Sequence, residues 1–253
     1  REKTTEQVNR NEDYPKIEVE ESAATVEFSN PFFKCTVSKK TGKITSYSYE
    51  EKEFLKQPLS FNAWRAPILN EQRHIAREWR KAGLDELIHR VESFGMNAES
   101  PCRYRVDITS NVTGADAESG FKLKTRLSIL GSGEITISQE VDPMGEMPER
   151  LPKIGLQAVL NKEFDHLQWF GRGPIETYPG RKQAASIGIY SKTVQELYES
   201  YIVPGDYGNR SDVRWAALTN EQGTGWMVTG DEVLNISAHP FSTDNLDRAR
   251  YTW

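Results

Sequence analysis

"FKLKTRLSILGSGEITISQEVD", residues 121–142, has the pattern of two strands joined by a tight turn. From Phe121 to Ile129, apolar residues alternate with basic and other polar residues. A period of two is typical of a strand with one buried face, because successive side chains point to opposite faces. The glycines of "GSG" at 131–133 suit a turn, and residues 134–142 return with the same period. The stretch therefore predicts an antiparallel hairpin.

The same alternation continues on both sides of this hairpin. Between Cys102 and Val112, apolar residues fall on one face and arginine, aspartate and asparagine on the other. Further strands are predicted at 25–29, 32–38, 44–50, 153–160 and 166–170, with a second hairpin at 214–230. Residues 70–83 have helical spacing, and residues 193–200 begin with the Thr-x-x-Glu pattern of a capping box. Together these elements predict an all-β sandwich fold with one or two short helices.

The composition is that of a soluble globular protein. The chain has 253 residues, of which 37% are hydrophobic and 27% charged, and its net charge is −5. No basic block stands out, so nucleic acid is not an expected partner. No apolar run is long enough to cross a bilayer. The two cysteines, Cys35 and Cys102, cannot make a disulfide framework and are expected to be free thiols in strands.

The first residues differ from the remainder. Residues 1–20 are polar and irregular, and we expect them to form a linker or the tail of a preceding β-sandwich domain, with the main domain at 21–253. The chain starts without a methionine or an apolar leader segment, so we expect an excised fragment or a processed chain.

Metal and nucleophile motifs are not found in the sequence. His74, His89, His166 and His239 do not stand at ligand spacing, and the cysteines do not form a zinc pair, so no metal is expected in this chain. There is no G-x-S-x-G elbow to nominate a catalytic serine.

"WFGRGPIETYPGRKQAASIGIY", residues 169–190, combines a glycine-rich turn with charged residues. A dinucleotide loop would need G-x-G-x-x-G, but Pro174 follows the second glycine and Glu176 would repel a phosphate. We interpret the stretch as a tight turn in which Arg172 and Arg181 flank Glu176 in a structural ion-pair cluster.

Sugar binding is the remaining chemical class. Six tryptophans and ten tyrosines would suit stacking on sugar rings, although aromatic residues fill β-sandwich cores just as well. Trp64, Trp79 and Trp215 fall in predicted loop or helix segments, which favours some aromatic surface.

Five runs of sequence, taken in order, resemble one family. They are "RAPILNE" (65–71), "EWRKAGLDEL" (78–87), "GRGPIETYPGRKQAASIGIY" (171–190), "YIVPGDYGNRSDVRW" (201–215) and "NISAHPFSTDNLDRARYTW" (235–253). Over residues 20–253 the chain resembles the C-terminal domain of glycoside hydrolase family 2 β-galactosidases.

The resemblance implies a galactose-mutarotase-like β-supersandwich within a retaining β-galactosidase. Both catalytic carboxylates of that family lie in an upstream TIM barrel, and this chain shows no βα alternation. The chain is therefore expected to contain no catalytic residue and no cofactor, while parent enzymes often use Mg or Na through the barrel. The implied partners are the TIM-barrel and β-sandwich domains of the same polypeptide and a galactoside. A homo-oligomer and a bacterial cytoplasmic or periplasmic location both fit the family.

The resemblance also assigns a site wall. The loop after the R-A-P triplet approaches the sugar in relatives, which maps to Arg65, Pro67, Asn70 and Glu71 here. Two family aspartates are replaced, by Leu69 and by Glu71, so polar contacts through them are not carried over.

A second family run supplies structural residues, namely Arg172, Glu176, Tyr178 and Arg181. Gly180 stands where relatives have aspartate, which leaves Glu176 as the expected partner of Arg181. Relatives also carry a late tryptophan that stacks on substrate, in a run that would follow residue 253, so the fold is expected to lack its last strands.

Two other functions are also compatible with the sequence. A stand-alone carbohydrate-binding module could share the fold. An aldose 1-epimerase would need a histidine paired with a carboxylate across a sugar ring, for which His166 and His239 are the late candidates.

Overall fold

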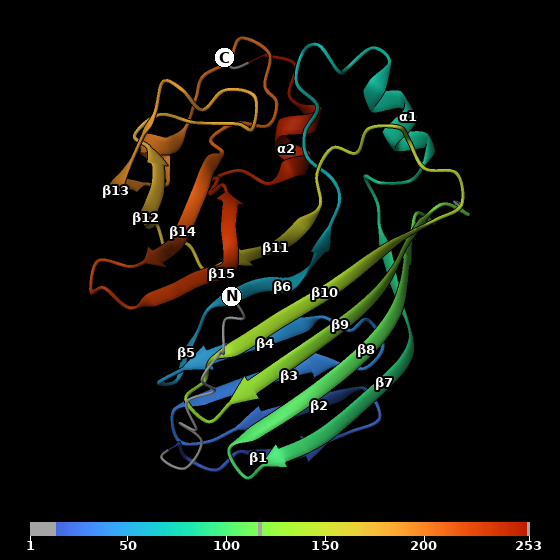
Figure 1. The fold of residues 1–253 in the computed structure, drawn as a ribbon, viewed down its shortest axis with the longest axis vertical. Coiled ribbons are helices and arrows are strands. Elements are labelled where there is room, and N and C mark those ends of the chain that lie inside the picture. The colour runs from blue at the N-terminus through green and yellow to red at the C-terminus, as the bar shows by residue number, and fades with distance from the viewer. Residues whose placement is uncertain (1–13, 116–117, 252–253) are drawn as a thin grey trace, which may run out of the picture. The chain divides into compact units, whose positions relative to one another are not determined.

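The computed structural model describes residues 14–115 and 118–251, which form two units of antiparallel sheet (Figure 1). Of the described residues, unit 1 contains 14–62, 81–115, 118–149 and Gly155–Val159. Unit 2 contains Ala63–Arg80, Arg150–Ile154 and residues 160–251. The all-β prediction is confirmed, since strands dominate both units.

Unit 1 contains two sheets. The larger has the order β1-β2-β3-β4-β6-β11, with β5 beside β4, and the smaller has the order β10-β9-β8-β7. The strands of the larger sheet are β1 (Glu18–Glu21), β2 (Thr25–Ser29), β3 (Phe33–Ser38), β4 (Ile44–Tyr49), β5 (Lys52–Glu53), β6 (Leu55–Asn62) and β11 (Gly155–Leu160). Those of the smaller sheet are β7 (Ile88–Ser100), β8 (Arg103–Thr113), β9 (Gly120–Leu130) and β10 (Ile135–Met144).

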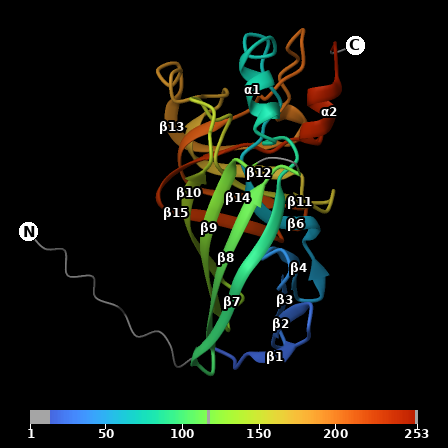
Figure 2. The same cartoon turned by 90° about the vertical axis from the view of Figure 1, so that its right-hand side faces the viewer.

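The two sheets of unit 1 pack face to face (Figure 2). The Phe28 ring of β2 lies 5.7 Å from that of Tyr104 on β8, and the Phe61 ring of β6 lies 5.2 Å from that of Phe121 on β9. Phe28, Phe61 and Phe121 are buried, and full burial of such a side chain contributes about 1.5–3 kcal/mol. This inter-sheet core explains why the apolar residues of the strands alternate.

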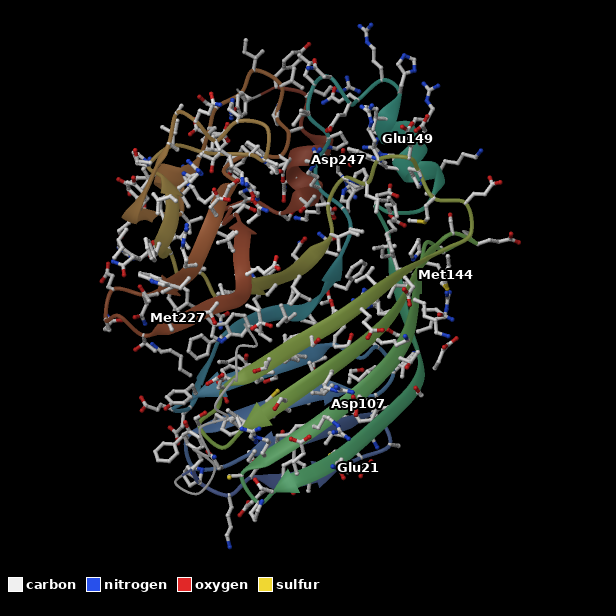
Figure 3. The ribbon with its side chains drawn as sticks, viewed as in Figure 1. Glu21, Asp107, Met144, Glu149, Met227 and Asp247 are labelled. Atoms are coloured by element: carbon white, nitrogen blue, oxygen red, sulfur yellow. The ribbon has the colours of Figure 1, made fainter. Side chains whose placement is uncertain are left out.

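The hairpin predicted at 121–142 is confirmed. β9 and β10 pair in register from Gly120 opposite Met144 to Ile129 opposite Ile135. The Leu130 amide donates to the Glu134 carbonyl at 3.0 Å, which closes the turn. On the outer face, Asp107 of β8 (Figure 3) accepts a hydrogen bond from Arg126 directly opposite on β9, at 2.8 Å.

Unit 2 is built on one four-stranded sheet of order β13-β12-β14-β15. Its elements are α1 (Ile75–Lys81), β12 (His166–Gly173), β13 (Ser186–Thr193), the single 3₁₀ turn η1 (Gln195–Leu197), β14 (Arg210–Thr219), β15 (Gly225–Ile236) and α2 (Thr243–Arg248). Trp169 of β12 is fully buried among Leu167, Leu197, Val213 and Ala216. This cluster fixes the sheet against η1.

The helices of unit 2 are shorter than the sequence predicts. The pattern at 70–83 yields only α1, because the residues before Ile75 form turns, and Gly83 follows with φ +70°. The capping box at 193–200 forms, since the Thr193 amide donates to Glu196 at 2.7 Å and the Glu196 amide to Thr193 Oγ1 at 3.3 Å. It supports a single 3₁₀ turn.

Both cysteines are buried thiols, and Cys35 lies in β3 as expected. Cys102 lies in the turn just before β8. Within residues 14–115 and 118–251, no helix is long and apolar enough to span a membrane.

Candidate functional site

The loop after the R-A-P triplet is closed by one bidentate ion pair. Arg65 Nη1 and Nη2 donate to the two carboxylate oxygens of Glu71, at 2.8 and 2.6 Å. Both side chains are largely enclosed, with 18% and 15% exposed. Burial of the Arg65 guanidinium opposes its charge, but the hydrogen bonds to Glu71 outweigh this and raise the pKa of Arg65. This geometry is among the stronger ion-pair arrangements in proteins.

Two further hydrogen bonds position the same loop. Glu71 also accepts from the Ile68 amide at 3.0 Å, and Arg65 Nε donates to the Pro152 carbonyl at 2.8 Å. Of the four predicted wall residues, Arg65 and Glu71 thus bind each other and the backbone of neighbouring residues. Pro67 is buried. Asn70 is exposed, together with its neighbours Ile68 and Leu69. We call the exposed residues 68–70 the loop crest.

A second segment, residues 205 and 206, packs against the backbone of the loop that carries the crest. The Asp206 amide donates to the Ala66 carbonyl at 3.0 Å. A Cβ atom on Gly205 would lie 2.9 Å from the Pro67 carbonyl oxygen and 3.1 Å from Ile68 Cα. Only glycine permits this close approach without a shift of the backbone. The P-G-D-Y-G run and the R-A-P loop are thus packed backbone to backbone.

The Glu176 carboxylate joins three segments of unit 2. It is 6% exposed and accepts hydrogen bonds from Arg181, from the Tyr201 hydroxyl and from the Gly208 amide, the last at 2.8 Å. Burial alone would raise the pKa of Glu176, but these three donors outweigh it and hold the pKa below the usual value. The Tyr178 hydroxyl lies 3.4 Å from the same carboxylate. The predicted pairing of Glu176 with Arg181 is confirmed.

Arg172 does not belong to this cluster, so the predicted Arg-Glu-Arg arrangement is wrong in that part. Arg172 Nε donates to Asp212 at 2.5 Å, and Lys182 Nζ donates to the other Asp212 oxygen at 2.6 Å. The reason is strand pairing, because Arg172 lies next to the last residue of β12 and Asp212 lies on the adjacent β14. These hydrogen bonds from Lys182 and Arg172 lower the pKa of Asp212.

Sequence reasoning did not find a group of polar residues near the base of the crest. Lys153, Asp206 and His239 come from three separate segments, and each interacts electrostatically with the others. Burial raises the pKa of Asp206 and lowers those of Lys153 and His239. No spacing motif connects these residues, so only the fold reveals the group.

The two histidines considered for epimerase chemistry are placed differently. His239 Nε2 lies 2.7 Å from the Tyr207 carbonyl, and its ring packs on that of Tyr207 at 4.4 Å. His166 lies at the start of β12, beside the exposed Asp165. Each histidine has a different carboxylate neighbour, since His239 interacts electrostatically with Asp206 and His166 Nδ1 lies 2.7 Å from Asp165. Among the described residues, no three His, Cys, Asp or Glu side chains converge as a metal site.

Arg210 is a further buried charge that the sequence did not single out. It is fully buried, its guanidinium lies 5.1 Å from the Trp169 ring centre, and Nη1 donates to the Gly208 carbonyl at 2.9 Å. Burial lowers the pKa of Arg210. Arg210 therefore binds the carbonyl of Gly208, whose amide donates to Glu176.

These contacts define an all-β module whose buried charges hold loops together. The sequence matches the family described as "Beta galactosidase small chain" over residues 29–253. The chain therefore belongs to the β-galactosidase small-chain family.

Named relatives are much longer proteins. The chain is 31% identical to a β-galactosidase of Priestia megaterium, with 92% of this chain and 22% of the relative aligned. It is 27% identical to the β-galactosidase of Pseudoalteromonas haloplanktis, with 93% of this chain and 23% of the relative aligned. It is 31% identical to the β-galactosidase of Lactobacillus delbrueckii subsp. bulgaricus, with 87% of this chain and 22% of the relative aligned. The chain thus spans less than a quarter of these relatives, which contain other domains in the same polypeptide.

Proposed function

We propose that this chain is the non-catalytic C-terminal module of a retaining β-galactosidase that hydrolyses terminal β-D-galactosides such as lactose. The family assignment and the small aligned share of each relative support this proposal. The two catalytic carboxylates, and any Mg or Na that the parent enzyme uses, would lie in a TIM barrel elsewhere in the polypeptide.

The observation that carries the proposal is the state of Glu176, the one carboxylate in residues 171–190. A retaining glycosidase needs one carboxylic acid that is protonated before bond cleavage and one nucleophilic carboxylate, about 5 Å apart. Tuning the acid requires a raised pKa. Glu176 has a lowered pKa and its oxygens are occupied by three donors, so it is suited to holding loops and not to proton transfer.

The proposed role of the module is to supply a rigid wall at the mouth of the active site. The loop crest, residues 68–70, is exposed, while Arg65 and Glu71 lock its ends and Gly205 supports its base. A preorganised wall of this kind positions a substrate without loss of loop entropy on binding. The crest would contact the sugar through Asn70 and the apolar side chains beside it.

Calorimetry of the purified chain with galactose and lactose tests this role against a carbohydrate-binding module. We expect very weak binding, because the barrel completes the site. Micromolar binding by the chain alone would favour the binding module. A polarimetric mutarotation assay with the same sample tests for aldose 1-epimerase activity, and we expect the uncatalysed rate.

A further inference from the structure

Unit 1 contains a small cavity between its two sheets, outside the site described above. Its volume is about 30 Å³, and residues of β4 and β6 line it on one side and residues of β7 to β10 on the other. This is room for two or three water molecules or one small ion, and not for a sugar ring. The polar groups that line it include Lys43, His89, Ser110, Thr125 and Gln139.

The cavity lining contains one cationic side chain, Lys43, and no carboxylate. Among the residues that line it, Lys43 and His89 are the titratable side chains, and there is no aspartate or glutamate. Burial lowers the pKa of Lys43, and no carboxylate in the described part of the chain forms an ion pair with it. A half-buried cation that lacks a counter-ion is unfavourable unless an anion or water compensates it.

His89 adds a second donor when the pH falls. Burial, and then the nearby charge of Lys43, lower the pKa of His89 to about 4, against a hydrogen bond to the Phe61 backbone that raises it. With one ring nitrogen engaged at Phe61, the other is an acceptor in the neutral ring and becomes a donor only on protonation. The remaining polar lining groups are neutral, so Lys43 is the charge that faces His89 in the cavity.

The walls of the cavity are firmly placed. Gly42 precedes Lys43 with φ +69°, and a Cβ there would lie 3.1 Å from Ile108 Cγ2, so the turn packs closely on β8. Gln139 Nε2 donates to Thr125 Oγ1 at 2.9 Å, which leaves the Thr125 hydroxyl hydrogen free to point elsewhere. The cavity is thus lined by a neutral hydroxyl donor, Thr125, as well as by the positively charged Lys43.

We propose that this cavity binds one small monovalent anion of chloride size, held by the Lys43 ammonium, the protonated His89 ring and a neutral donor such as the Thr125 hydroxyl. The lack of any carboxylate in the lining and the small volume select an inorganic anion over a cation or a sugar. The anion favours protonated His89, so by linkage its affinity increases as the pH decreases.

Bromide is the probe, because it replaces chloride and scatters anomalously. Crystals of the full-length protein are soaked in sodium bromide at about pH 4, because the pKa of His89 is about 4 and about half of the rings are then protonated before any anion binds. We expect an anomalous peak between Lys43 and His89, lost in Lys43→Met. Lys40→Met is the matched control, because Lys40 is exposed in the same turn and does not line the cavity. A cavity that holds only water, or a peak unchanged in Lys43→Met, would overturn the proposal.

A second measurement needs no variant. The pKa of His89 is followed by NMR in chloride and in gluconate at equal ionic strength. A tenfold preference of chloride for the protonated state corresponds to a rise of about one unit in the His89 pKa. An identical His89 titration in the two salts would also overturn the proposal.

Discussion

The Glu176 carboxylate accepts a hydrogen bond from the Gly208 amide at 2.8 Å across 32 residues of sequence. The same carboxylate is bound by Arg181 and Tyr201, so hydrogen bonds of Glu176 connect residues 171–190 to the P-G-D-Y-G run. Gly205 of the second run in turn supports the loop crest. The buried acid therefore acts on the crest through backbone contacts.

Replacing this acid should affect stability and leave the chemistry intact. In the full-length enzyme, Glu176→Gln removes the charge that three donors bind and should lower the free energy of unfolding by about 1–3 kcal/mol. Glu221→Gln, at an exposed position, should have little effect. Denaturant titration and the pH-rate profile are the measurements. Loss of turnover with unchanged stability would mean that Glu176 takes part in catalysis.

The contribution of Glu176 should depend on pH in a defined direction. Its folded-state pKa is lowered from 4.5, so the stabilisation is fully present above 4.5 and is lost as the pH falls through the folded value. The difference in unfolding free energy between the wild type and Glu176→Gln should therefore shrink in acid. A difference that grows below pH 4.5 would contradict the lowered pKa.

The pair that closes the crest loop should show energetic coupling. Arg65 and Glu71 are enclosed and bidentate, so a double-mutant cycle of Arg65→Met and Glu71→Gln should give about 1–3 kcal/mol of interaction free energy. Additive effects of the two substitutions would show that the pair does not hold the loop. In the parent enzyme, Glu71→Gln should raise KM more than it lowers kcat, because the crest positions substrate.

Two glycines offer a matched comparison. Gly205→Ala places a Cβ 2.9 Å from the Pro67 carbonyl oxygen and should destabilise the chain by about 1–3 kcal/mol. Gly180→Ala meets no atom within 4 Å and should be nearly neutral. Thermal unfolding of the two variants side by side is the measurement. Equal melting temperatures would show that the two runs are not packed as described.

The strands could be predicted from sequence where one face of a strand is buried. The alternation from Phe121 to Ile129 is local and needs no knowledge of the partner strand. β7 was missed because none of its 13 residues is buried, so it shows no apolar period. α2 was missed because a helix of six residues is too short to display a period.

The site was only partly predictable for a different reason. Arg181 lies five residues from Glu176, and their pairing could be inferred from the turn between them. The partner of Arg172 lies 40 residues away on β14, at Asp212, where φ is +54° and the register with β15 shifts. Long-range register of this kind is set by the whole sheet, and so are the positions of Lys153, Asp206 and His239.

The central claim is that this module supports hydrolysis without performing it. The most direct measurement compares the isolated chain, shown to be folded by circular dichroism, with the full-length protein in hydrolysis of a chromogenic β-galactoside. We predict turnover by the full-length protein and no turnover by the isolated chain above the buffer rate. Hydrolysis by the isolated chain that disappears in Glu176→Gln would contradict the account.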